Sequence, residues 1–213
     1  MTEKSTKERI LDEAEHLFAL KGYHNTSLRE ITGKAVANLA AVNYHFGSKE
    51  NLLDAVIKRR LNHLDRQRLG QLEDITAVAQ KDKRLPRVDD ILRAFIEPTI
   101  RSLTPEAESR DFITIISRAH TDPDGTIRHL FLQKLRPTFE AFLRALSEAL
   151  PQLPVNTVHC RFLFAIGAMA HTIMRAGHSE FFTHLPVDDA QNVDVLSLTE
   201  ELIAFASRGM GGA

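Results

Sequence analysis

Apolar residues recur every three to four positions through most of this chain, which is the spacing of an amphipathic α-helix. The first such segment begins after Ser5, which forms a capping-box pattern with Glu8, and it ends at Gly22. Its predicted buried stripe is Ile10, Leu11, Ala14, Leu17 and Phe18. No segment alternates between apolar and polar residues as a strand does, so the pattern predicts an all-α protein.

Two short helical segments follow, joined by a turn of only a few residues. Thr26 or Ser27 caps the first of them, in which Ile31 is expected to point back toward the preceding helix. Asn38 caps the second, which ends near Phe46. A connection this short makes the two helices cross steeply, so the start of the second helix can project from the domain.

The remainder of the chain is predicted to be helical as well. A long helix begins at Ser48 and runs past Ile75. Its basic residues are expected to form a solvated face: Lys58, Arg59, Arg60, Arg66 and Arg68. After a polar linker at 81–87, further helices are expected near residues 88–103, 105–120, 124–150, 154–177 and 194–208. The predicted fold is therefore an N-terminal three-helix helix-turn-helix head and a larger helical body.

Hydrogen-bond donors gather near the end of the second short helix. Tyr44, His45 and Lys49 lie within six positions of one another, and each side chain can donate to phosphate oxygens. The candidate base-reading residues are Leu39, Ala40, Ala41 and Asn43, with Arg29 as a helper. The pattern predicts a helix presented to the major groove of double-stranded DNA. The alternative is an ordinary three-helix segment in which Tyr44 and His45 are surface residues.

Five short segments within residues 7–58 carry a family resemblance: Arg9–Asp12, Leu17–Phe18, Lys21–Tyr23, Thr26–Ile31 and Val42–Glu50. Together they resemble the N-terminal domain of TetR-family transcriptional regulators. The resemblance implies a homodimeric, all-helical DNA-binding protein, in most members a repressor, whose larger C-terminal domain binds a small ligand. The segment Asn38–Phe46 is also similar to a fatty-acid-responsive branch of the family.

The resemblance also implies roles for individual residues. The family's phosphate contacts correspond to Thr26, Tyr44, His45 and Lys49, and its base-reading positions to Asn38–Asn43. The complete predicted DNA-binding set is Thr26, Ser27, Arg29, Asn38, Leu39, Ala40, Ala41, Asn43, Tyr44, His45 and Lys49.

The turn between the two short helices departs from the family pattern. The family usually has Ala-Gly-Val in this turn, whereas this chain has Ala35-Val36-Ala37. If the turn keeps its usual geometry, Val36 takes a backbone angle that favours glycine, at a cost of roughly 1 to 3 kcal/mol.

Charge and composition limit where the protein can act. The net charge is −1, divided into +3 for residues 1–69 and −4 for the rest, so a DNA-binding face must be local.

The lone Cys160 excludes an intramolecular disulfide, and we expect it to be a buried structural thiol. The polar N-terminus is unlike a signal peptide, and the longest apolar run, 162–170, is shorter than the ~20 residues of a membrane span. We therefore expect a cytoplasmic protein with no membrane partner.

The phenylalanines favour an apolar interior in the body, since all 12 except Phe18 and Phe46 lie there. A pocket for a small apolar effector, with an acyl chain and an anionic head group as one possibility, is predicted from Phe95, Thr99, Phe112, Ile116, Arg118, Phe139, Phe162, Ile166 and His171. The alternative for each aromatic residue is a fully packed core.

The last two helices favour self-association. Small and apolar residues predict an isologous interface across a two-fold axis, formed by Leu163, Gly167, Ala170, Leu198, Leu202 and Phe205. Burial of these residues within one subunit is the alternative. A dimer would place two reading helices about 34 to 36 Å apart, as a palindromic operator requires.

Patterns typical of enzymes are lacking in the sequence. His159, His171, His178 and His184 do not have the spacing of zinc ligands, and neither a nucleophile elbow nor a phosphate-binding glycine loop is present. We predict no catalytic residue, no metal and no cofactor.

The predicted function is a homodimeric repressor that a small effector releases from its operator. The alternatives are a DNA-binding dimer without an effector and a helical enzyme with a vestigial head. We assign residues 1–50 to DNA binding and 51–213 to effector binding and dimerisation.

Overall fold

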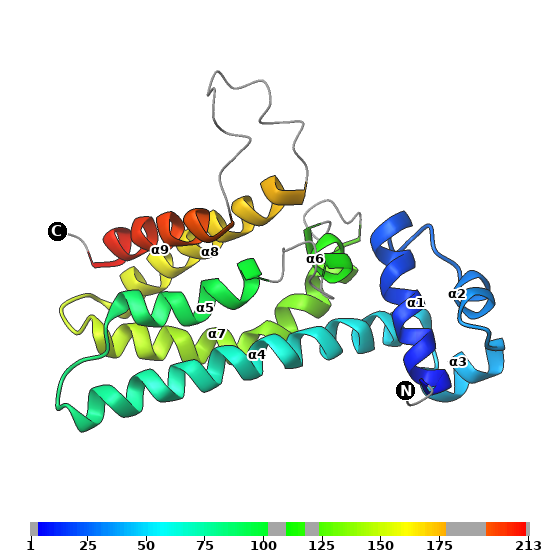
Figure 1. Cartoon of the computed structure of the whole chain (residues 1–213), viewed down its shortest axis with the longest axis horizontal. Helices are drawn as coiled ribbons and strands as arrows, with labels where there is room; N and C mark the ends of the chain where they lie inside the picture. Colours follow the sequence, from blue (N-terminus) through cyan, green and yellow to red (C-terminus); the bar gives the residue numbers. More distant parts are fainter. Residues whose placement is uncertain (1–3, 102–109, 118–123, 178–194, 212–213) are drawn as a thin grey trace, which may run out of the picture. The chain divides into compact units, whose positions relative to one another are not determined.

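The computed structural model describes residues 4–101, 110–117, 124–177 and 195–211, which form nine helices and no strand (Figure 1). The helices are α1 (Thr6–Lys21), α2 (Leu28–Lys34), α3 (Leu39–His45), α4 (Lys49–Lys81), α5 (Val88–Arg101), α6 (Arg110–Ser117), α7 (Thr126–Ala149), α8 (Val155–Gly177) and α9 (Val195–Gly211). The predicted all-α fold with an N-terminal helix-turn-helix head is confirmed. The predicted ends of α6 lie outside the described residues.

The chain divides into two compact units, and each is described by itself. Unit 1 comprises residues 1–62 and 108–134, and unit 2 comprises residues 63–107 and 135–213. The helices α4 and α7 contribute to both units, because the divisions after residues 62 and 134 fall inside them. Compactness does not test the predicted assignment of residues 1–50 and 51–213 to separate functions, which stays a prediction.

Helix starts in unit 1 follow the capping residues. The Ser5 hydroxyl accepts a hydrogen bond from the Glu8 backbone amide, and the Glu8 carboxylate accepts one from the Ser5 amide at 2.9 Å. This capping box satisfies amides that have no partner inside α1. Apolar residues of α1, α2, α3 and the first part of α4 are then buried, among them Ile10, Leu17, Phe18, Ile31, Val42, Leu52 and Leu53.

An ionic cluster joins α1 to α4 within unit 1. Glu15 of α1 is 2 % exposed, and it accepts hydrogen bonds from Arg59 at 2.6 Å and from Arg60 at 2.8 Å. Arg59 also donates to Asp12 at 2.7 Å. The prediction that the basic run of α4 is a solvated face is therefore wrong for Arg59 and Arg60. A guanidinium group can donate to two carboxylates at once, which favours pairing over hydration here.

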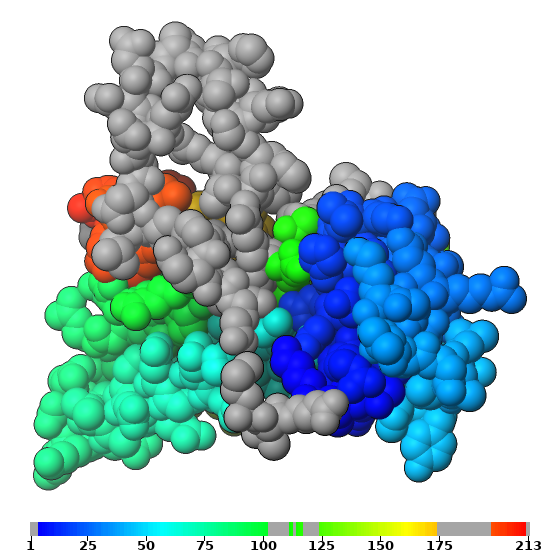
Figure 2. Space-filling view, turned by 45° about the vertical axis from the view of Figure 1, so that its right-hand side comes forward, coloured from blue at the N-terminus to red at the C-terminus, as the bar shows by residue number. Residues whose placement is uncertain are grey.

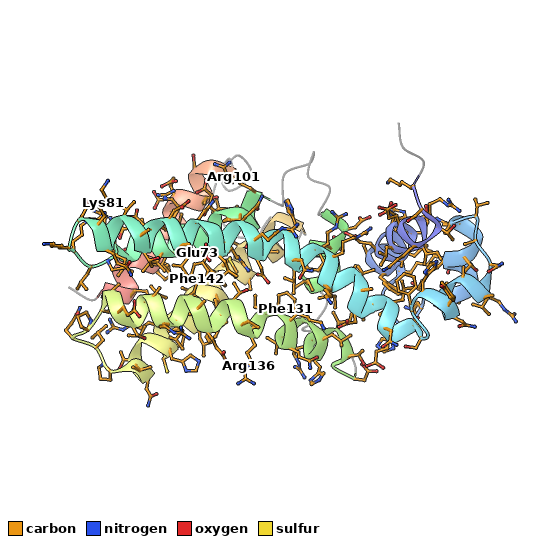
Figure 3. All side chains as sticks on the ribbon, turned by 90° about the horizontal axis from the view of Figure 1, so that it is seen from below. Glu73, Lys81, Arg101, Phe131, Arg136 and Phe142 are labelled. Atoms are coloured by element: carbon orange, nitrogen blue, oxygen red, sulfur yellow. The ribbon has the colours of Figure 1, made fainter. Side chains whose placement is uncertain are left out.

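Aromatic side chains form the core of unit 2. The ring of Phe95 on α5 lies 5.0 Å from that of Phe142 on α7 and 5.1 Å from that of Phe162 on α8. Phe139 stacks on Phe162 at 5.0 Å. Figure 3 shows Phe142 between α4 and α7, whereas Arg136 lies on the outer side of α7. Phe95, Phe142 and Phe162 are each no more than 1 % exposed, so these rings pack on one another rather than on solvent.

Two further predictions about unit 2 are wrong. Arg68, which we expected on the solvated face of α4, is 2 % exposed, because it continues the buried stripe of Leu61, Leu64 and Leu72. Cys160, which we expected to be buried, is exposed, because it lies on a face of α8 that no part of the described chain covers. Lys58 and Arg66 are exposed as predicted.

Candidate nucleic-acid interface

The turn between α2 and α3 orients the projecting helix, and Val36 lies at its centre. Ala35 is the last residue with helical angles, Val36 has a φ of 48°, and the Ala37 amide donates back to the Thr32 carbonyl at 2.9 Å. This is the hydrogen bond of a Schellman motif, in which the residue after the helix takes the left-handed conformation. The structure thus places Val36 in the strained conformation that the sequence predicts.

Arg9 holds this turn against α1, a role that sequence reasoning missed. Its Nε donates to the Ala35 carbonyl at 3.1 Å, and its terminal nitrogens donate to the Lys4 carbonyl and the Thr6 hydroxyl. The guanidinium group thereby links the end of α2 to the start of α1. Arg9 is part of the family resemblance, which was the one signal that could have pointed to it.

Predicted DNA-contact residues gather on the exposed side of α3. Tyr44 is 86 % exposed and Leu39 is 40 % exposed, and Ala40, Asn43 and His45 are exposed beside them. Figure 2 shows α2 and α3, in the lighter blues, at the surface of unit 1. An open depression on this unit is lined by Thr6, Thr32, Gly33, Val36, Ala37, Asn38, Ala40, Ala41, Tyr44 and His45. The structure therefore brings most of the predicted set onto one surface.

Lys49 lies at the start of α4, close to the loop after α1. Its ammonium group is 4.5 Å from the centre of the Tyr23 ring and 3.4 Å from the His24 carbonyl. Partial burial lowers the pKa of Lys49. The aromatic ring favours the charged form by a cation–π contact and holds the side chain near the end of α3. The cation is thus kept in position without an acidic partner among the contacts the structure gives.

Three residues of the predicted set are used inside the domain. Thr26 is 2 % exposed, and its hydroxyl faces the carbonyls of Leu17 and Gly22. Ser27 caps α2, where its hydroxyl accepts from an amide, and the Asn38 side chain accepts from the Ala41 amide at 2.8 Å to cap α3. The caps therefore occupy the Glu30 and Ala41 amides at the starts of α2 and α3. Arg29 is exposed on α2.

The predicted pocket residues lie in both units. Phe112 and Ile116 of α6 belong to unit 1, whereas Phe95, Thr99, Phe139, Phe162, Ile166 and His171 belong to unit 2. Arg118 lies outside the described residues. Phe95 and Phe162 are packed against other rings, and Thr99 bonds to Arg68. The pocket stays a prediction.

The predicted self-association residues of α8 and α9 divide by exposure. Leu163 is 47 % exposed and Phe205 is 68 % exposed, and Gly167 is exposed with them. Leu202 is buried within the chain at 7 %, and Ala170 and Leu198 are half-buried. Phe164, which the prediction left out, is 74 % exposed. A helical wheel would have placed Phe164 beside Leu163 on the same uncovered face.

The described residues contain neither a metal-binding cluster nor a helix that could span a membrane. Within residues 4–101, 110–117, 124–177 and 195–211, no group of three or more His, Cys, Asp or Glu side chains has an arrangement that could hold a metal ion. His178 and His184 lie outside this part of the chain. None of the helices in the same part combines the length and hydrophobicity that crossing a membrane requires.

A helix-turn-helix whose second helix is exposed, joined to a larger helical part, is the architecture of a DNA-binding transcriptional regulator. Residues 10–56 match the family described as bacterial regulatory proteins, tetR family, and residues 93–209 match the tetracyclin repressor-like C-terminal domain. The second match alone spans more than half of the chain. The chain belongs to the TetR family, as the resemblance within residues 7–58 implied.

Curated relatives match only part of the chain. The chain is 40 % identical over 62 residues to the transposon Tn10 TetC protein of Escherichia coli, which is 29 % of this chain and 32 % of that protein. It is 31 % identical over 88 residues to a probable HTH-type transcriptional regulator, YttP, of Bacillus subtilis, which is 41 % of this chain and 42 % of that protein. The matched region thus spans less than half of either relative.

Solved structures share the fold along the whole chain. The fatty acid degradation regulator FadR from Bacillus halodurans matches with a TM-score of 0.70 at 13 % identity, covering 100 % of this chain and 98 % of that one. FadR from Bacillus subtilis in complex with stearoyl-CoA matches with a TM-score of 0.68 at 16 % identity, covering 95 % and 98 %. At these identities the likeness establishes the fold.

Proposed function

We propose that this regulator is a homodimeric repressor that binds a palindromic DNA operator and that a small, largely apolar effector releases it. The observation that carries the proposal is the exposed side of α3, where Leu39, Ala40 and Asn43 lie beside Tyr44 and His45. This side joins side chains suited to base edges with side chains suited to phosphates. Residues 1–50 would supply the DNA-binding function and residues 51–213 the other two.

Each group on this surface has a distinct part in the proposed complex. Asn43 is positioned to pair with adenine, while Ala40 and Ala41 are small enough to meet thymine methyl groups. Tyr44, His45 and Lys49 would donate to phosphate oxygens and fix the register of α3 in the groove. Thr26 is omitted from the direct contacts that we propose, because its hydroxyl is buried against two carbonyls.

Self-association through α8 and α9 is supported by their exposed apolar side chains. Leu163, Phe164 and Phe205 expose large parts of their apolar side chains, and apolar side chains that gather at a surface mark interaction sites. Burying them against the same residues of a second copy would form the isologous four-helix contact that the sequence predicts. The two reading helices could then occupy successive major grooves.

Coupling to an effector is supported by the continuity of α4. Arg59 and Arg60 fasten the first part of α4 to Glu15 of α1, and the same helix continues through Arg68 to Lys81 in unit 2. An effector that shifts the later part of α4 would therefore act on the DNA-binding helices. The structural relative FadR from Bacillus subtilis binds stearoyl-CoA, and the phenylalanine-rich core of unit 2 suits an apolar ligand. Each tenfold loss of DNA affinity requires about 1.4 kcal/mol of differential effector binding.

The test is a selection of random duplex DNA against the purified protein. The comparison variant is Tyr44→Ala/Lys49→Ala, and the matched control is Lys58→Ala, which removes an exposed lysine of α4 outside the proposed face. We expect the parent and Lys58→Ala to enrich the same palindrome and the double variant to enrich none. Helical content and melting, followed by circular dichroism, must be unchanged in all three. Enrichment of the same palindrome by the double variant would contradict the assignment of the surface.

A further inference from the structure

A charged side chain lies in the aromatic core of unit 2. Arg68 is 2 % exposed, and its guanidinium carbon lies 4.0 Å from the centre of the Phe95 ring. Its Nε donates to the Phe95 carbonyl at 3.0 Å, and one terminal nitrogen donates to the Thr99 hydroxyl at 2.5 Å. The positive charge of Arg68 is therefore surrounded mainly by neutral hydrogen-bond acceptors and one aromatic ring.

The carboxylate nearest to this charge compensates it poorly. The second terminal nitrogen of Arg68 lies 3.8 Å from Oδ1 of Asp65, which is too far for a hydrogen bond. That Oδ1 is buried without a hydrogen-bond partner, while Thr138 bonds to the Asp65 carboxylate. Burial raises the pKa of Asp65 and lowers the pKa of Arg68 to about 10. The attraction between Asp65 and Arg68 therefore offsets only part of the free energy that removing both charges from water costs.

The surroundings define what a better partner would be. The Phe95 ring beneath Arg68 also contacts Phe142 and Phe162, and Phe139 stacks on the latter. The part of a ligand that pairs with the guanidinium must be anionic. The part that lies among these rings must be apolar. A carboxylate offers two oxygens to the planar fork of an arginine, which is the strongest pairing available to it.

We propose that Arg68 is the anchor for the carboxylate of an amphipathic effector, a straight-chain carboxylic acid whose hydrocarbon tail inserts among the phenylalanines of unit 2. The inference rests on the proposed function, since it names the chemical class of the effector. The ligand carboxylate pairs with the two terminal nitrogens of Arg68, and Thr99 and Thr138 provide hydroxyls beside it. Arg118 and His171, the charged and titratable candidates from the sequence, have no part in this site.

Binding at Arg68 would act on two helices at once. In the described state, Arg68 of α4 ties down the Phe95 carbonyl of α5. A ligand carboxylate at the two terminal nitrogens competes with the Thr99 hydroxyl of α5 for one of them. The ligand therefore changes how α4 is held by α5 and gives the carboxylate a direct effect on α4.

The test is isothermal titration of the full-length protein with hexanoate, decanoate and palmitate, each paired with the alcohol of the same chain length. The variant is Arg68→Met, which removes the charge and keeps an apolar side chain of similar length. Arg66→Met is the matched control, because Arg66 is an exposed arginine of the same helix. We expect the parent and Arg66→Met to bind at least one acid roughly tenfold or more tightly than its alcohol. Arg68→Met should lose that preference and keep its affinity for the alcohol.

Removing Arg68 leaves Asp65 without its cation, so a second variant guards against misfolding. Asp65→Asn/Arg68→Met removes both charges and should retain the helical content of the parent. If an acid and its alcohol bind equally well to the parent, or if the acid keeps its advantage in both Arg68 variants, the inference is wrong while the proposed apolar effector stands. If the parent binds neither compound at any chain length, this inference is wrong, whereas the selection of duplex DNA tests the proposed DNA binding separately.

Discussion

Replacing Val36 by glycine should stabilise the DNA-binding head. Val36 has a φ of 48° at the end of α2, and it is the only non-glycine residue of unit 1 with a positive φ among the described residues. Its side chain is 82 % exposed, so removing it sacrifices little packing. The substitution keeps the Schellman hydrogen bond from Ala37 to Thr32, which involves backbone atoms alone.

The magnitude follows from two opposing effects. A left-handed conformation costs an ordinary L-residue roughly 1–2 kcal/mol, and Val36 also carries a β-branch. Glycine avoids this cost but loses about 0.5–1 kcal/mol through its greater freedom in the unfolded chain. The free energy of unfolding of the head should therefore rise by about 1 kcal/mol.

Tyrosine fluorescence during urea unfolding can follow the head specifically, because the chain has no Trp and two Tyr residues, Tyr23 and Tyr44. Both lie in unit 1, and the Tyr23 ring packs 5.5 Å from that of Phe18. Unfolding of unit 1 should change the emission of Tyr23 most, since Tyr44 is already exposed. The Val36→Gly variant should show a higher midpoint with an unchanged slope.

Two controls separate relief of strain from a general effect of glycine. Lys83→Gly makes the same change at a φ of 52° beyond the end of α4, which lies in unit 2, so it should leave the tyrosine transition in place. Ala37→Gly introduces glycine at the neighbouring position without a positive φ and should lower the midpoint. An equal or lower midpoint for Val36→Gly would refute the claim that this turn is strained.

Three other outcomes are expected. Glu15→Ala should destabilise the head by about 2–3 kcal/mol in the same urea assay, because it leaves Arg59 and Arg60 partly buried without their shared carboxylate. Burial raises the pKa of Asp12, but hydrogen bonds from Lys4 and Arg59 outweigh it and lower the pKa overall. This carboxylate therefore stabilises the fold above its unfolded pKa near 3.8, and the contribution is lost as the pH falls through the lower folded value, so Asp12→Asn should flatten the acid limb of a pH–stability profile. Phe164→Lys should convert the proposed dimer to a monomer in sedimentation velocity, because it places a charge in the proposed interface on the exposed face of α8.

Matched controls accompany these three variants. Glu13→Ala and Glu13→Gln alter a neighbouring carboxylate of α1 that has no part in the ionic cluster, so they should change neither the urea midpoint nor the acid limb appreciably. Val78→Lys places a charge at an apolar position of α4 that is 50 % exposed, and it should leave the oligomeric state unchanged. Loss of the dimer with Val78→Lys as well would speak against a specific interface on α8.

Local patterns in the sequence predicted the helices and the strained turn because their causes lie within a few residues. Ser5, Ser27 and Asn38 each cap a helix as predicted, and Val36 has the positive φ expected if the turn keeps the geometry of a family that usually has glycine there. Boundaries of this kind depend on hydrogen bonds between near neighbours in the chain.

The sequence did not show which basic residues of α4 are buried and which are exposed, because their partners lie elsewhere in the chain. Arg59 and Arg60 pair with Glu15, which lies 44 and 45 positions earlier. Arg68 had a local signal, since it occupies the helical register of the buried leucines, but a charged residue in such a register does not indicate its partner. Thr99, which bonds to Arg68, lies 31 positions further on.

Sequence reading by α3 is tested most directly by two affinities of the purified protein, one for the enriched duplex and one for a scrambled duplex of the same composition. Both are measured by fluorescence anisotropy over a series of salt concentrations. We predict that the enriched duplex binds about a thousandfold or more tightly than the scrambled one at physiological salt, and that Asn43→Ala reduces this ratio while the salt slope stays the same. Equal affinities for the two duplexes at every salt concentration would contradict the claim that α3 reads DNA sequence.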